Sequence, residues 1–282
     1  MTATLASAVR ALDNLYPPAL KEEWDRVGLV CGDPNASVTK AAFAVDPTVE
    51  AVRRALEWGA DLMVVHHPLL LRPVSSVAAT TFKGAIVHSL IKANCALYTA
   101  HTNADAACGG VADALAGLLG LELTRPLVPD GRDPRAGIGR VGELPEPARL
   151  REVAQMLADG LPPNHHGVRI AGPVDALVRS VAVVGGSGDS LFDAVRQAEV
   201  DVYVTADLRH HPALEAREEA EFAGAGRPYL LDMSHSASEW GWLERAAEQL
   251  GAELSRSGAR VETWVIPEVA DPWTARAERI DV

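Results

Sequence analysis

Histidine and acidic side chains follow several short apolar runs in this 282-residue chain. His66 and His67 come directly after the run Asp61-Leu62-Met63-Val64-Val65 and are followed by Pro68. The run is too short for a helix and ends in β-branched residues, so it predicts a buried strand that Pro68 stops from pairing further. Ligands bind at the carboxyl ends of strands in open α/β sheets. The histidine pair is therefore a candidate metal site, although two surface histidines after a strand would give the same pattern.

Further donors follow two other predicted strands. Strand 96–100 is followed by the His-x-x-x-acid element His101-Thr102-Asn103-Ala104-Asp105. A second element of this kind, from His235 to Glu239, follows strand 229–232. Imidazole and carboxylate donors without thiolates suit Zn, Fe, Mn or Ni and argue against a structural zinc site. Five donors exceed what one tetrahedral ion with an open position needs, so they predict two divalent ions per chain, about 3.5–4 Å apart. The candidate metal ligands are His66, His67, Asp105, His235 and Glu239.

Each donor also has a structural interpretation. Ser236-Ala237-Ser238-Glu239 matches a capping box, and Asp105 could cap a helix. His101 is either a proton carrier beside the metals or a half-buried structural histidine. For comparison, the pair His165-His166 follows Pro-Pro-Asn and is predicted to be solvent-exposed, and His88 is predicted to be an ordinary helix residue.

The order of elements repeats within the chain. Strand 41–45, helix 48–58 and strand 60–65 lead to His66-His67-Pro68, whereas strand 181–184, helix 189–198 and strand 200–204 lead to Asp207-Leu208-Arg209-His210-His211-Pro212. Each half then reaches its His-x-x-x-acid element, which predicts two related βαβ-type units. The repeat makes His210 and His211 mirror the first pair. Because five ligands already complete a dinuclear site, we expect the second pair to support the ligands, contact substrate or be purely structural.

These elements predict an α/β protein of two internally related lobes with the metal site between them. The first lobe is expected to comprise residues 1–124 plus 240–282, and the second residues 125–239. Residues 122–145 are rich in Pro, Gly and Arg, which is typical of a crossover between lobes. The loop from Gly185 to Gly188 could cradle a phosphate on backbone N–H groups, but a tight turn before a helix explains it equally well.

Composition excludes several classes of protein. The net charge is −12, from 26 basic and 38 acidic side chains, so we expect no nucleic-acid partner. Three cysteines without C-x-x-C spacing point to a reducing compartment. The N-terminus lacks the basic region of a signal peptide and no apolar stretch reaches the length of a membrane span. We therefore expect a cytoplasmic protein with no membrane partner.

The chain resembles the GTP cyclohydrolase I type 2 homolog family, also called NIF-three-like proteins, in its compact form without the inserted domain of longer members. The matching segments are Trp24-Asp25-Arg26-Val27-Gly28-Leu29, Val65-His66-His67-Pro68-Leu69, His101-Thr102-Asn103-Ala104-Asp105, Gly109-Gly110-Val111, Gly186-Ser187-Gly188, Asp207-Leu208-Arg209-His210-His211 and His235-Ser236-Ala237-Ser238-Glu239. The resemblance implies a dinuclear centre on the same five ligands, two interlinked α/β lobes and a ring-shaped homohexamer. Ala104 departs from the larger apolar residue usual there. Residues expected to contact substrate or support the ligands are Trp24, Asp25, Asn103, His210 and His211.

Two functions fit these residues. The first is a metal-dependent hydrolase for a small phosphorylated or nucleotide-like substrate, with His101 transferring protons; the family name itself suggests opening of the GTP ring. Two divalent ions, two carboxylates and a bridging hydroxide leave about one positive charge, which allows a small anionic ligand. The second is a metal-binding scaffold or metal-delivery protein without turnover. Dinucleotide-dependent redox chemistry would rest on the glycine loop alone.

Overall fold

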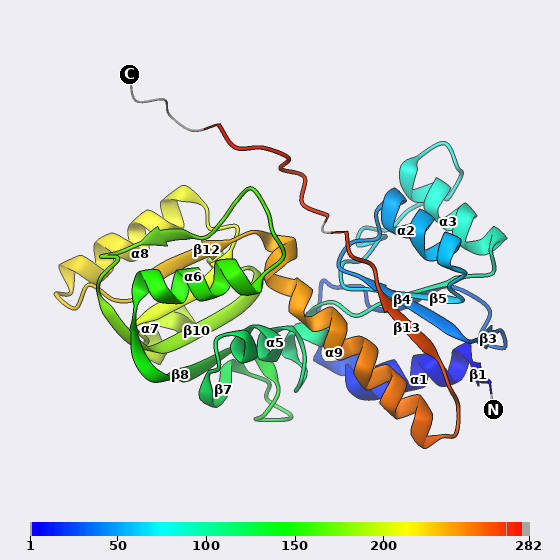
Figure 1. Ribbon diagram of the computed structural model, residues 1–282, viewed down its shortest axis with the longest axis horizontal. Coiled ribbons are helices and arrows are strands. Elements are labelled where there is room, and N and C mark those ends of the chain that lie inside the picture. The colour runs from blue at the N-terminus through cyan, green and yellow to red at the C-terminus, as the bar shows by residue number, and fades with distance from the viewer. Residues whose placement is uncertain (1, 269, 278–282) are drawn as a thin grey trace. The chain divides into compact units, whose positions relative to one another are not determined.

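The computed structural model describes residues 2–268 and 270–277, and the chain divides into two compact units. The first unit contains the residues up to Gly110 together with Trp242–Ala270, and the second contains Val111–Gly241 together with the described residues from Asp271. Helix α9 (His235–Arg256) begins in the second unit and belongs to the first from Trp242 onward. Figure 1 labels many of the elements of both units.

The first unit is built on a five-stranded sheet with the order β13-β4-β5-β6-β2. Neighbouring strands are parallel except for β2 and β6. The strands are β2 (Gly28–Cys31), β4 (Lys40–Ala44), β5 (Leu62–Val65), β6 (Ala96–Thr99) and β13 (Glu262–Val265), and β1 (Ala3–Thr4) pairs separately with β3 (Ser37–Val38). In β13, Trp264 packs against Trp58 of the same unit, with ring centroids 5.4 Å apart. That contact lies within one unit, and Trp273 is exposed.

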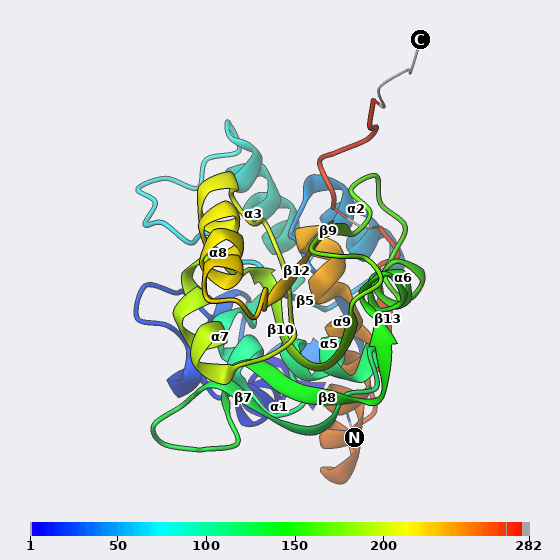
Figure 2. The same ribbon diagram turned by 90° about the vertical axis from the view of Figure 1, so that its left-hand side faces the viewer.

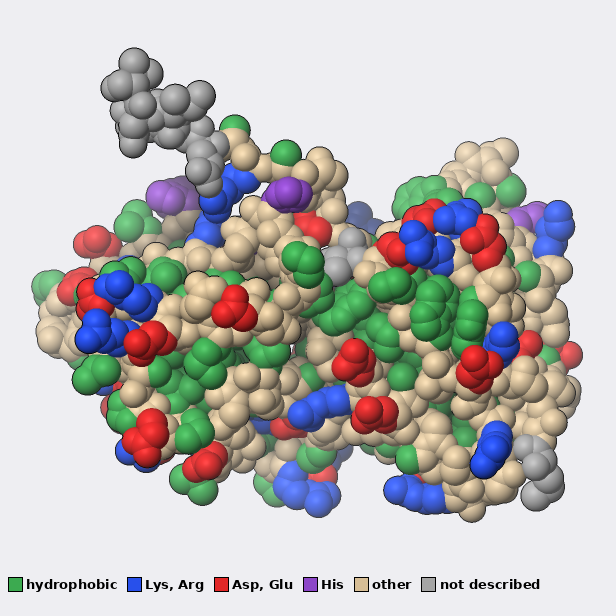
Figure 3. Space-filling model, in the orientation of Figure 1, with side chains coloured by type: hydrophobic (Ala, Val, Ile, Leu, Met, Phe, Trp, Pro, Cys, Tyr) green, Lys and Arg blue, Asp and Glu red, His purple; other side chains and the backbone are tan. Residues whose placement is uncertain are grey.

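Helices cover both faces of this sheet. They are α1 (Leu5–Leu15), the short η1 (Pro18–Leu20), α2 (Val49–Trp58), α3 (Phe82–Lys92) and α4 (Thr102–Ala106). Side chains of α2 and α3 form a core with Met63, Val65 and Leu97, while α1 and the end of α9 lie on the opposite face (Figure 1). Thr48 caps α2 by accepting a hydrogen bond from the N–H of Ala51. On the face drawn in Figure 3, acidic and basic side chains are interspersed, as in the ion pairs along α2.

The second unit is built on a six-stranded mixed sheet with the order β7-β8-β10-β11-β12-β9. The strands are β7 (Glu122–Pro129), β8 (Gly137–Arg149), β9 (Arg169–Ala171), β10 (Leu177–Ser187), β11 (Val202–Ala206) and β12 (Tyr229–Met233). The central strands β10, β11 and β12 are parallel, and the outer strands are antiparallel to their neighbours.

Alternate side chains of the central strands enter two different cores. The helices are α5 (Val111–Leu118), α6 (Leu150–Gly160), η2 (Asp189–Leu191), α7 (Phe192–Ala198) and α8 (His210–Phe222). Val181 and Val183 face α5 and α6, whereas Ala182 and Tyr203 face α7 and α8. Figure 2 shows α6 and α8 on opposite sides of the strands. A sheet buried on both faces explains the continuous apolar runs in the sequence.

The predicted internal repeat is present in the topology. Each unit contains four strands in which one antiparallel strand precedes three parallel strands in the chain, giving β4-β5-β6-β2 and β10-β11-β12-β9 in space. Asp61 accepts hydrogen bonds from the N–H groups of Thr39 and Lys40 at the start of β4, and Asp201 does the same for Arg179 and Ser180 in β10. The α/β prediction with two related halves is therefore confirmed.

One prediction about the connection was wrong. Residues 122–145 form β7 and most of β8, which pair antiparallel within the six-stranded sheet, rather than an irregular crossover. The prolines suggested a loop, but β7 is an edge strand, where the missing N–H of Pro126 removes few hydrogen bonds from the sheet. Helix α8 was not predicted, because only Ala216 and Ala220 of it are buried and its apolar pattern is weak. No described helix is long and apolar enough to cross a membrane.

Candidate metal-binding clusters

In the first unit, two neighbouring strands bring three histidines together. His66 and His67 follow β5, and His101 follows β6. Because β5 and β6 are parallel partners with Val65 opposite Thr99, their carboxyl ends meet at one edge of the sheet. One ring nitrogen from each histidine lies within 4.8 Å of the others. The spacing is suitable for binding a metal ion.

Each ring in this cluster is oriented by a hydrogen bond at Nδ1. His66 donates to the carbonyl oxygen of Ala100, His67 to Oδ1 of Asp46 and His101 to Oδ1 of Asp25, each at 2.8 Å. A carbonyl or carboxylate oxygen only accepts, so Nδ1 carries the proton and Nε2 keeps its lone pair. This is the arrangement in which metal-binding histidines are held.

Asp105 adds a carboxylate to the cluster. It lies on α4, and its Oδ1 is 3.6 Å from Nε2 of His66. His66 is fully buried and Asp105 is largely covered, so both donors are in a site from which much water is excluded.

Asp25 supports the same cluster from the loop before β2. It is fully buried and accepts hydrogen bonds from the N–H and Oγ1 of Thr102 as well as from His101. Burial alone would raise the pKa of Asp25, but the hydrogen bonds from His101 and Thr102 hold this pKa well below its ordinary range. Asp25 is therefore ionised. The ring of the exposed Trp24 stands edge-on to His101, with centroids 5.8 Å apart.

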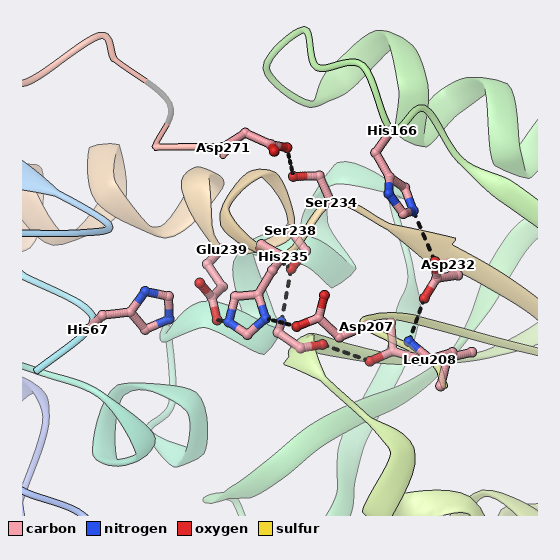
Figure 4. A network of polar contacts seen from close by, with 12 residues as sticks. His67, His166, Asp207, Leu208, Asp232, Ser234, His235, Ser238, Glu239 and Asp271 are labelled. Atoms are coloured by element: carbon pink, nitrogen blue, oxygen red, sulfur yellow. Dashed lines mark hydrogen bonds and ion pairs between the residues drawn. The ribbon is translucent and has the colours of Figure 1, made fainter. Parts of the chain in front are cut away.

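The second unit holds a histidine–carboxylate pair at the start of α9. His235 and Glu239 are four residues apart and lie on one face of the helix, with Nε2 and Oε1 3.2 Å apart. His235 donates from Nδ1 to Oδ2 of Asp207 at 2.7 Å, as drawn in Figure 4. Glu239 is buried, and because α9 begins at His235, it lies in the second helical turn rather than at a capping position. The capping-box interpretation of Glu239 therefore does not hold.

The glycine loop after β10 packs against this pair. A Cβ on Gly186 would lie 2.6 Å from Oε1 of Glu239 and 3.2 Å from Nε2 of His235, and the residue has a φ of +68°. Its N–H donates to Oγ of Ser238, and its carbonyl oxygen accepts from Thr205. The turn interpretation of this loop is thus the one that the hydrogen bonds support.

Other histidines lie elsewhere in the units. His210 and His211 are exposed in the first turn of α8, four and five residues after β11, whereas His66 and His67 are the first two residues after β5. The position that follows β11 directly is taken by Asp207. The two pairs are therefore not structural equivalents, although the sequence repeat aligns them.

Two further histidines served as comparisons in the sequence. His165 is exposed as predicted, but His166 is half-buried and its Nε2 lies 3.0 Å from Oδ2 of Asp232, so the prediction of an exposed pair was wrong for His166. His88 is an exposed residue of α3.

Buried Asn103 holds the loop before α4, because its side chain accepts from the N–H of His101 and donates to the carbonyl of Tyr16.

Sequence reasoning named Asp25 as a supporting residue but missed two other acids that orient the rings. Asp46 follows β4 and Asp207 follows β11, each at the carboxyl end of a central parallel strand. The strand-end rule that selected the histidines applies equally to these two aspartates.

Together, the fold and these donors define an α/β protein with His/Glu clusters able to bind metal ions. The chain belongs to the Duf34/NIF3 (NGG1p interacting factor 3) family, whose model matches residues 3–272. It is 52% identical to a GTP cyclohydrolase 1 type 2 homolog of Streptomyces coelicolor over 96% of this chain and 94% of that protein. It is 35% identical to a protein of the same name from Mycobacterium bovis, over 97% of each chain. Among solved structures, a hypothetical protein of Staphylococcus aureus matches with a TM-score of 0.87 at 26% identity, over 98% of this chain and 100% of that one.

Proposed function

We propose that this protein is a metal-dependent hydrolase that binds two divalent ions through His66, His67, Asp105, His235 and Glu239. The observation that carries the proposal is the tautomer in which the histidine ligands are held. All three histidine ligands donate Nδ1–H to an acceptor of their own unit and keep Nε2 for a metal. Metal-binding histidines almost always donate their other ring N–H in this way.

The donor set fits zinc, iron, manganese or nickel. Bound ions of this kind generate a hydroxide near neutral pH and polarise the bond under attack. The contribution of the chain is to hold the imidazole rings in one tautomer and to balance charge through Asp105 and Glu239. Asp46 and Asp207 fix the orientation of the rings that they accept from.

His101 is the proposed proton carrier. Its Nδ1–H is bonded to the ionised Asp25, which leaves Nε2 as the nitrogen that can take up a proton. Asp25 and Thr102 therefore act through His101, and exposed Trp24 covers one side of its ring.

The proposed substrate is small and phosphorylated or nucleotide-like. Two divalent ions with two carboxylates and a hydroxide retain about one positive charge, which attracts an anion into an otherwise acidic protein. Relatives of this chain carry the name GTP cyclohydrolase 1 type 2 homolog, so GTP is the first compound to test.

The test compares purified, metal-analysed protein with three variants on GTP, other nucleotides and phosphomonoesters. We expect hydrolysis by the loaded protein, loss of metal and turnover in His66→Ala, and no change in His88→Ala, the exposed histidine of the same unit. His101→Ala should keep its metal and lose about 100-fold or more in kcat. Loss of metal from His101→Ala would identify His101 as a ligand and contradict its role as proton carrier.

The alternative is a metal-binding scaffold or metal-delivery protein. The anchoring of the rings favours metal binding whether or not there is turnover. If the loaded protein and His66→Ala show the same background rate across the panel, the scaffold function replaces the hydrolase.

We also propose a homo-oligomer, a hexameric ring, on the basis of the family resemblance. Light scattering of the purified protein in physiological salt checks this proposal. A particle with the 29.9 kDa mass of a single chain would reject it.

A further inference from the structure

The second unit contains a pocket that does not include any proposed metal ligand. It lies between the edge strand β9, its neighbour β12 and helix α8, and has a volume of about 370 Å³. This volume is within the range of small-molecule sites. We call it the β9–α8 pocket. It is lined by Arg169, Ile170, Ala171, Leu208, His210, Ala213, Leu214, Arg217, Leu230 and Asp232.

One end of the β9–α8 pocket lies where ligands bind in α/β sheets. Asp232 is near the carboxyl end of β12, and Leu208 follows β11. The N–H of Leu208 donates to Oδ1 of Asp232 at 2.8 Å, which fixes this end of the pocket. His210 stands in the first turn of the 13-residue helix α8, whose N-terminus favours an anion.

The charged groups around the pocket differ in what they can offer a ligand. The lining contains two guanidinium groups and one carboxylate, and Glu221, which lies outside the lining, pairs with Arg217. Arg217 is held in place, because it donates to the carbonyls of Gly226 and Pro228 and lies over the ring of Tyr229. Its role is to shape the wall.

Arg169 is available to a ligand. Its Nε and Nη2 donate to Oδ2 of Asp232, and among the described residues its Nη1 has no hydrogen-bond partner. The side chain is 59% exposed and belongs to the pocket lining. The charge of Asp232 is matched by Arg169, and its Oδ2 also lies 3.0 Å from Nε2 of His166.

The remaining walls are aliphatic. Side chains from β9, α8 and β12 provide them, and the lining contains no ring on which a base could stack except the imidazole of His210. A hydrophobic body with one anionic head matches these walls better than a nucleotide does.

We propose that the β9–α8 pocket binds a small carboxylate with an apolar body. The carboxylate accepts a charge-assisted hydrogen bond from Nη1 of Arg169 beside the N-terminus of α8. The body of the ligand lies against Leu208, Ala213 and Leu230.

The test uses 4-phenylbutyrate as the probe, with 4-phenylbutanol as its neutral analogue, and follows chemical shifts of the full-length protein. We expect saturable binding of the acid and at least about tenfold weaker binding of the alcohol. Arg169→Gln should weaken binding of the acid to the level of the alcohol. Ala213→Phe fills the pocket and should abolish binding of both.

Two controls separate this site from others. Arg179 of β10 is similarly exposed, at 56%, and pairs with a carboxylate, so Arg179→Gln should bind as the unchanged protein does. His66→Ala tests the metal ligands, because a carboxylate could also bind a metal ion. Three results would overturn the proposal. The first is saturable binding that survives in both Arg169→Gln and Ala213→Phe. The others are loss of binding in His66→Ala and absence of binding at millimolar probe.

Discussion

Hydrogen bonds at single nitrogen atoms determine which side of each histidine can bind a metal. In all four rings of the two clusters, Nδ1 donates a hydrogen bond, and the acceptors are Ala100, Asp46, Asp25 and Asp207. In each ring, Nε2 is therefore the nitrogen whose lone pair can bind a metal. The acceptors come from strand ends and loops far apart in sequence. Such support fixes the tautomer before any metal arrives, which reduces the cost of binding.

At Gly186, the absence of a side chain makes room for a pair of donors. Gly186→Ala would combine a left-handed backbone with a Cβ 2.6 Å from Glu239, whereas Gly120 has a similar φ of +63° and no atom within 4 Å of an added Cβ. Both variants should lose about 1–3 kcal/mol of stability from backbone strain. Only Gly186→Ala should also lower zinc affinity. Urea denaturation and zinc titration of the two variants provide the measurement. Equal zinc affinities would show that crowding of Glu239 by a Cβ at position 186 does not affect metal binding.

At Cys95, burial makes a thiol resistant to ionisation. Burial, with smaller contributions from Cys31 and Asp61, raises the pKa of the Cys95 thiol from 9.0 to about 12. The unfolded thiol ionises at a lower pH than the folded one, so this group stabilises the fold fully below about pH 9 and loses that contribution as pH rises toward 12. The urea midpoint should fall between pH 9 and pH 11, and Cys95→Ala should reduce that fall. Cys108→Ala is the matched control, because Cys108 is exposed, and a pH dependence that is unchanged in Cys95→Ala would contradict the assignment.

At the scale of elements, the two sheets repeat one device. Asp61 and Asp201 each accept hydrogen bonds from two consecutive backbone N–H groups, just before the parallel pairing of β4 with β5 and of β10 with β11 begins. Asp61→Ala and Asp201→Ala should therefore destabilise the protein by similar amounts, about 1–3 kcal/mol each, because each leaves two N–H groups without an acceptor. Asp193→Ala, at an exposed position on α7, should have little effect on the same urea curves. If Asp61→Ala or Asp201→Ala lost almost no stability, the two aspartates would not make equivalent contributions to the fold.

Strand ends were predictable from the sequence because short apolar runs stop at polar residues. The runs before His66 and Asp105 correspond to β5 and β6, and their parallel pairing joins the donors of the first unit. The hairpin of β7 and β8 was not predictable in this way, since its prolines and glycines resemble those of a loop. Pairing at the edge of a sheet is a tertiary effect that local composition does not reveal.

At the scale of the whole molecule, the sequence repeat was informative about topology and misleading about chemistry. It predicted two related units, and the shared strand order bears this out. It also aligned His210-His211 with His66-His67, although three additional residues place the second pair on α8. The structurally equivalent position holds Asp207, which orients His235 instead. Each unit has therefore kept the same framework and filled its strand ends with different groups.

Metal content of single variants tests the proposed centre most directly. Protein purified without chelators should contain close to two transition-metal equivalents per chain, because five N and O donors suit two ions. His66→Ala and His67→Ala should lose metal, whereas His210→Ala and His211→Ala should retain it, since the second pair is exposed in the first turn of α8. Elemental analysis of the four variants beside the unchanged protein gives the result. Half an equivalent or less in the unchanged protein after reconstitution, or equal loss from both pairs, would contradict the proposed ligand set.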